Sequence, residues 1–73
     1  MVDKVLDFRG KECPEPLIKT SKILSNIKKG DKATILTDIE DCVRLIKELI
    51  EIFNVEDLSV EKTNGYWIIK VLM

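Results

Sequence analysis

The sequence predicts an α+β fold, a two-layer sandwich of order β-α-β-α-β-β in which two helices cover one face of a four-stranded mixed sheet. The chain has 73 residues, 45% of them hydrophobic and 34% charged, which suits one soluble domain with one modest core. Two segments repeat apolar residues every three or four positions, as amphipathic helices do, and short apolar runs around them end in turn residues. We therefore predict a single domain over residues 1–73.

The first strand and the first helix are predicted at residues 5–9 and 14–29. The segment VLDFR alternates apolar and polar side chains, as a half-buried strand does. Pro14 suits the first helical position because the N–H that proline lacks has no helical partner there. Lys28 and Lys29 would then lie in the last turn, near the negative end of the helix dipole. Helical spacing places one set of residues on one face: Leu17, Ser21, Leu24 and Ile27.

The second strand and the second helix are predicted from residue 32 onward. KATILT, residues 32–37, forms the strand, and Asp38 is predicted to cap the helix because aspartate favours that position. The helix ends at Asn54. Its apolar stripe follows steps of four and three: Ile39, Val43, Ile46, Ile50 and Phe53.

A β-hairpin is predicted at the end of the chain. Two strand-like runs, residues 58–62 and 66–72, flank Asn64-Gly65, and this dipeptide is a strong hairpin signal because both residues tolerate positive φ. If the first two strands are parallel, both helices begin at the same edge of the sheet. Cys13 and Asp38 would then lie on one rim.

Composition narrows the function classes. The net charge is −1 and the sequence pI is about 5.4, which disfavours direct nucleic-acid binding through a broad basic surface. Neither a membrane-spanning run nor a signal peptide is recognisable, so we predict a cytoplasmic protein whose two cysteines stay reduced. The sequence contains no histidine, and we predict no metal site and no cofactor.

Cys13 is the residue whose setting suggests chemistry. It lies in the polar segment GKECPEP, just before the predicted helix, where the positive helix end together with Arg9 and Lys11 would lower its pKa from the free value of about 8.5. A catalytic Cys–His pair is excluded because there is no histidine. An activated thiol without a base suits group carriage, in which it accepts a sulfur atom as a persulfide and passes it on.

The segment LDFRGKECPEPLIKT resembles the TusA/SirA-like sulfur-carrier family, whose signature is Leu-Asp-x-x-Gly-x-x-Cys-Pro-x-Pro. The matching residues are Leu6, Asp7, Gly10, Cys13, Pro14 and Pro16. The likeness covers nearly the whole chain, including the KKGD turn, the TD after the second strand and the final hairpin. It implies the same two-layer sandwich and a persulfide on Cys13.

The resemblance also implies partner proteins. Sulfur would come from a cysteine desulfurase or a rhodanese-like donor and pass to an acceptor protein in tRNA thiolation, cofactor synthesis or sulfur metabolism. The loop and helix start that support the cysteine would be Asp7, Gly10, Pro14, Glu15 and Pro16. Many family members carry an Arg-Asp-Ile-Pro-like segment after the TD, whereas this chain has IEDCVRLIKELI, so the resemblance does not specify the partner surface.

Two residues of the second helix each have two interpretations. Cys42 is predicted to be a small core residue, and the alternative is a second thiol near Cys13 that resolves or relays its persulfide. Asp38 is predicted to be a helix cap, and the alternative is a residue that orients a partner at the rim.

Two other functions also remain open for the whole chain. One is a regulatory interaction module without sulfur chemistry, and the other is a redox sensor that uses both cysteines. The sequence does not predict an oligomeric state.

Overall fold

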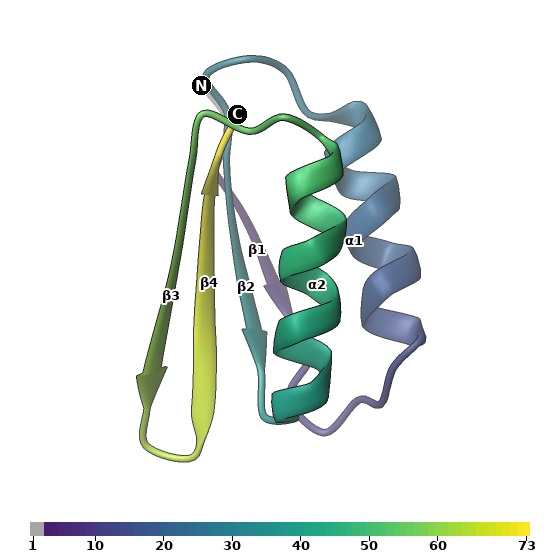
Figure 1. The fold of residues 1–73 in the computed structure, drawn as a ribbon, viewed down its shortest axis with the longest axis vertical. Coiled ribbons are helices and arrows are strands. Elements are labelled where there is room, and N and C mark those ends of the chain that lie inside the picture. Colours follow the sequence, from purple (N-terminus) through teal and green to yellow (C-terminus); the bar gives the residue numbers. More distant parts are fainter. Residues whose placement is uncertain (1–2) are drawn as a thin grey trace.

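The computed structural model describes residues 3–73 and contains the six predicted elements in the predicted order (Figure 1). Their bounds are β1 (Asp3–Asp7), α1 (Glu15–Asn26), β2 (Lys32–Thr37), α2 (Glu40–Ile52), β3 (Asp57–Thr63) and β4 (Tyr66–Leu72). β2 and β4 match their predicted limits residue by residue. The predicted α+β fold with four strands and two helices is confirmed.

The four strands form one mixed sheet of order β1-β2-β4-β3. β1 and β2 are parallel, with Asp3 opposite Lys32, and both later pairings are antiparallel. β3 and β4 are joined through Asn64 and Gly65, and Gly65 has the positive φ of 81° that glycine adopts without strain. Because β1 and β2 run the same way, α1 and α2 both begin at the edge where those strands end (Figure 1).

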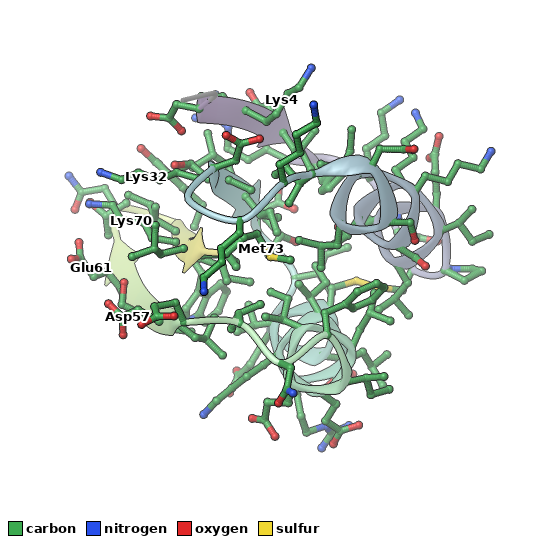
Figure 2. All side chains as sticks on the ribbon, turned by 90° about the horizontal axis from the view of Figure 1, so that it is seen from above. Lys4, Lys32, Asp57, Glu61, Lys70 and Met73 are labelled. Atoms are coloured by element: carbon green, nitrogen blue, oxygen red, sulfur yellow. A yellow bond between two sulfur atoms is a disulfide. The ribbon has the colours of Figure 1, made fainter. Side chains whose placement is uncertain are left out.

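The core lies between the sheet and the two helices. β2 and β4 direct alternate side chains toward the helices, and Ile35 and Ile69 are fully buried there. α2 contributes Ile46 and Ile50 from one face, each also fully buried. The opposite face of the sheet carries polar side chains, among them Lys32, Lys70, Asp57 and Glu61, which point away from the helices (Figure 2).

The bounds of β1 and α1 differ most from the predicted ones, and those of α2 and β3 differ by one or two residues. β1 pairs over residues 3–7 instead of 5–9, because the chain turns after Phe8, where the Lys11 N–H donates to the Phe8 carbonyl. α1 ends at Asn26 instead of residue 29, because Ile27 is extended. Lys28 and Lys29 therefore lie in the following turn, where the Lys28 N–H donates to the Asp31 carboxylate at 3.1 Å.

The buried face of α1 also differs from the predicted one. The buried residues are Pro16, Thr20 and Leu24, at steps of four, whereas Ser21 is only partly buried. Thr20 is fully buried, and its Oγ1 has no hydrogen-bond partner among the described residues. The spacing of apolar residues does not predict which polar residue occupies a core position.

Candidate functional site

Two loops meet at the edge of the sheet where both helices begin. The first joins β1 to α1 and carries Cys13, and the second joins β2 to α2 and carries Asp38. These loops, together with the start of α2, form what we call the cysteine rim: residues 8–14, Asp38 and Cys42. Parallel strands explain the meeting, because their carboxyl ends lie at one edge of the sheet.

Asp38 holds the cysteine loop and does not cap α2. Both carboxylate oxygens lie 3.1 Å from the Gly10 nitrogen, which donates to them across 28 positions of sequence. The N-cap of α2 is Ile39, whose N–H donates to Thr37 Oγ1 at 3.4 Å. The predicted helix-cap role of Asp38 is therefore wrong, because its carboxylate is directed to the neighbouring loop.

Gly10 allows that contact through its backbone conformation. Its φ is 80°, in the left-handed region that glycine adopts far more easily than other residues. A Cβ atom added there would meet no atom within 4 Å, so the requirement is conformational and not steric. Gly10 therefore turns its N–H toward Asp38 and sets the path of the chain leading to Cys13.

Asp7 and Arg9 form the second support of the loop. The Arg9 side chain donates through Nε and Nη2 to the two carboxylate oxygens of Asp7 at 2.9 and 2.8 Å, and the Arg9 backbone N–H donates to Oδ1 at 3.1 Å. The Arg9 guanidinium also lies over the Tyr66 ring, 4.8 Å from its centroid. The loop is thus tied to the start of β4, and the charge of Arg9 is directed to Asp7.

The hydrogen bonds from Arg9, first from its side chain and then from its backbone, lower the pKa of Asp7 from 3.8 to about 2. The folded pKa lies below the unfolded one, so the ionised carboxylate adds stability above about pH 4 that is lost as pH falls toward 2.

We expect the difference in unfolding free energy between wild type and Asp7→Asn, measured by denaturant titration, to become smaller as pH falls from about 4 to 2. Arg9→Gln, which removes the donor, should give the same profile. A difference that does not change with pH would contradict this assignment.

Cys13 precedes α1 and is partly buried against the core. The N-cap of α1 is Pro14, whereas the predicted helix start at Pro14 would make Cys13 the N-cap. Neither Pro14 nor Pro16 has an N–H, and the Glu15 N–H donates to the Glu12 carbonyl at 3.2 Å. The helix start therefore offers the cysteine fewer free N–H donors than expected. Glu15 adds an exposed ion pair with Lys19 at 3.3 Å.

Cys42 lies in the first turn of α2 and belongs to the core, with 1% of its surface exposed. It also forms a disulfide with Cys13, because the start of α2 places the two Cα atoms 5.9 Å apart. The prediction that both cysteines stay reduced is therefore wrong for this structure. Figure 2 shows this bond in yellow between the two helices. Cys42 is thus a buried residue and, at the same time, a direct sulfur neighbour of Cys13. Of the two, only Cys13 is partly exposed.

The described residues form no metal site and no membrane-spanning helix, and an open hollow lies away from the rim. Over residues 3–73, no group of three or more His, Cys, Asp or Glu side chains is arranged to hold a metal ion, and no helix is long and apolar enough to cross a membrane. An open hollow of about 380 Å³ lies on the polar face of the sheet, lined by Lys32, Lys70 and Asp57 among others. It lies at the opposite end of the strands from Cys13.

Comparison with known proteins identifies the family. The family model described as "Sulfurtransferase TusA" matches residues 4–72 of the chain. The chain belongs to the TusA family. The Cys-Pro-x-Pro segment, the cysteine rim and both helices all lie within the matched range.

Relatives of this TusA-family chain match over most of their length. A protein of Archaeoglobus fulgidus described as "Putative sulfur carrier protein" is 33% identical over 67 residues, covering 92% of each chain. One from Thermotoga maritima with the same description is 33% identical and covers 84% of this chain and 77% of its own. The crystal structure of a SirA-like protein from Desulfitobacterium hafniense superposes with a TM-score of 0.81 at 25% identity, covering 97% and 95% of the two chains.

Two contacts of the rim have no signal in the local sequence. The stacking of Arg9 on Tyr66 joins the first loop to the hairpin, and the bond from Gly10 to Asp38 joins two distant loops. For the second contact, the sequence could predict only that the two loops lie close together, because parallel strands place Cys13 and Asp38 on one rim. The stacking depends on the order in which the strands pair, and the sequence does not specify that order.

Proposed function

We propose that this protein carries sulfur as a persulfide on Cys13 and passes it to a partner protein in a sulfur relay. The observation that carries the proposal is the placement of Cys13. It is the partly exposed cysteine of a sulfurtransferase-family chain, held before α1 by a loop that Asp7 and Asp38 fix. A carrier needs an accessible thiol on a fixed backbone and no deep pocket, because its partner supplies the rest of the site.

The transfer requires the reduced protein. The Cys13 thiolate attacks the outer sulfur of a persulfide on the donor, the donor's inner S–S bond breaks, and the donor cysteine leaves as a thiolate. Cys13 then carries the extra sulfur, which an acceptor nucleophile removes by the same kind of displacement. A Cys13 that is bonded to Cys42 cannot take part, so a thiol reductant has to open the disulfide first.

The donor that we propose is a cysteine desulfurase or a rhodanese-like protein. The acceptor would belong to tRNA thiolation, cofactor synthesis or sulfur metabolism, and the place of action would be the cytoplasm, where thiols are kept reduced. The exposed charged side chains beside the rim, including Lys11 and Glu12, would affect the rate of encounter and the choice of partner.

The experiment is an intact-mass measurement after the reduced protein is incubated with a cysteine desulfurase and cysteine. We expect a gain of one sulfur atom that maps to Cys13, disappears on treatment with reductant and is abolished in Cys13→Ser. Cys42→Ser serves as the matched control, since it replaces the buried cysteine and keeps Cys13. Failure of several donors to add sulfur to folded protein with an alkylatable Cys13 would contradict the proposal.

The disulfide favours a second candidate, a thiol redox sensor that uses Cys13 and Cys42. Such a sensor would form the bond reversibly with a mild oxidant and would change its affinity for a partner, with no gain of sulfur. The mass experiment separates the two candidates. A carrier gains sulfur from the donor, whereas a sensor only loses two hydrogen atoms when it is oxidised.

A further inference from the structure

We infer that Cys42 is a resolving thiol that discharges the Cys13 persulfide as hydrogen sulfide and leaves the Cys13–Cys42 disulfide. This inference rests on the proposed carrier function. It starts from one juxtaposition: the partly exposed Cys13 and the 1% exposed Cys42, on separate elements 29 positions apart in sequence, are within bonding distance. A buried cysteine that served only as a core residue would not need to face the carrier thiol.

The two loops of the rim bring about this juxtaposition. Asp38 holds Gly10 in the loop that leads to Cys13, and Cys42 follows Asp38 by one turn of α2. The distance of 5.9 Å between the Cα atoms falls within the range that a disulfide needs without movement of the backbone. The reduced protein therefore keeps both thiols in position to react.

The reaction balances without an external oxidant. The Cys42 thiolate attacks Sγ of Cys13, a new S–S bond forms, and the bond from Cys13 Sγ to the outer sulfur breaks. The outer sulfur leaves with the electron pair as hydrosulfide and takes up a proton from solvent. The carried sulfur is thereby reduced to sulfide while the two cysteines are oxidised to the disulfide. A thiol reductant then restores both thiols.

The geometry favours attack on the inner sulfur over attack on the outer one. The structure brings Cys42 Sγ into bonding contact with Cys13 Sγ, the atom that would be attacked. Attack on the outer sulfur would move that sulfur onto Cys42, whose surface is 1% exposed in a packed core, where a partner could not collect it. Hydrosulfide is also a better leaving group than an alkyl thiolate.

The consequence is a limit on how long the carrier holds its sulfur. An acceptor has to take the sulfur from Cys13 before Cys42 displaces it. Without an acceptor, the carrier releases sulfide and closes to the disulfide, in which Cys13 accepts no further sulfur. The loaded state would then persist only in variants that lack the Cys42 thiol.

The test loads reduced full-length wild type and Cys42→Ser with a cysteine desulfurase and limiting cysteine, removes the small molecules, and follows intact mass and free sulfide over time. We expect wild type to lose the added sulfur, release one equivalent of sulfide and finish two hydrogen atoms lighter than the reduced protein. We expect Cys42→Ser to keep the persulfide. Cys42→Ala is the second variant, in case serine disturbs the buried site.

The outcomes separate this inference from the proposed function. If neither wild type nor the Cys42 variants gain sulfur at Cys13, the carrier function fails, and the inference fails with it. If wild type and both variants load and keep the sulfur equally long, with no sulfide released, the carrier function stands and the resolving role of Cys42 is overturned. Loss of sulfur from wild type without formation of the disulfide would also overturn it.

Discussion

Replacing Ile46 by alanine should destabilise the fold by about 2 to 5 kcal/mol, the usual cost of truncating a buried isoleucine. Ile46 is fully buried where α2 packs on the sheet, between Cys42 and Ile50 on the same helix face. A 73-residue domain has a total stability of roughly 4 to 11 kcal/mol. The substitution should therefore remove a large share of it, measured as a lower denaturant midpoint of the oxidised protein.

Ile52→Ala is the matched control, because it makes the same chemical change at the end of the same helix. Ile52 is 78% exposed, so its truncation should change the unfolding free energy by no more than about 0.5 kcal/mol. Equal losses for the two variants would mean that α2 does not pack through the face that carries Cys42, Ile46 and Ile50.

The spacing of apolar residues and the turn residues between the runs together predicted all six elements, because apolar spacing reflects which side chains the sheet and helices bury. β2 and β4 lie in the middle of the sheet and pair on both sides. Each is a continuous strand-like run bounded by turn residues, so its limits could be predicted. β1 is an edge strand whose start depends on pairing with Lys32, and α1 ends where Ile27 becomes extended. Those limits depend on contacts between elements, which a local pattern does not encode.

For the candidate site, the local sequence could indicate Cys13, but it missed contacts between residues that are distant in sequence. Cys13 could be selected because of its polar, proline-rich setting. Asp38 follows a strand and precedes a helix, so the local pattern predicted a cap, but the structure directs its carboxylate to Gly10 in another loop. The proximity of Cys42 to Cys13 was one of two open interpretations, because it depends on the rotation of α2 about its axis. In the structure, the buried residues Cys42, Ile46 and Ile50 follow at steps of four and set that rotation.

Reduction of the Cys13–Cys42 disulfide should lower the free energy of unfolding by about 3 to 4 kcal/mol. The bond joins residues 29 positions apart, and a cross-link that closes a loop of this length removes that much chain entropy from the unfolded state. The measurement compares denaturant midpoints with and without a thiol reductant. Cys13→Ser should unfold near the midpoint of the reduced wild type and should not respond to reductant. A wild-type midpoint that reductant leaves unchanged would show that the two cysteines are not bridged.

This stability difference bears directly on the proposed chemistry. Folding and disulfide formation form a closed thermodynamic cycle, so the free energy by which the bond stabilises the fold is also the free energy by which the fold favours the bond. At about 3 to 4 kcal/mol, this preference corresponds to a factor of a few hundred in the equilibrium for closing the disulfide. The carrier-competent form of the protein, with Cys13 free, would therefore be the less stable one. Discharge of a Cys13 persulfide by Cys42 would gain that free energy, whereas transfer to an acceptor would leave the protein reduced and ready to load again.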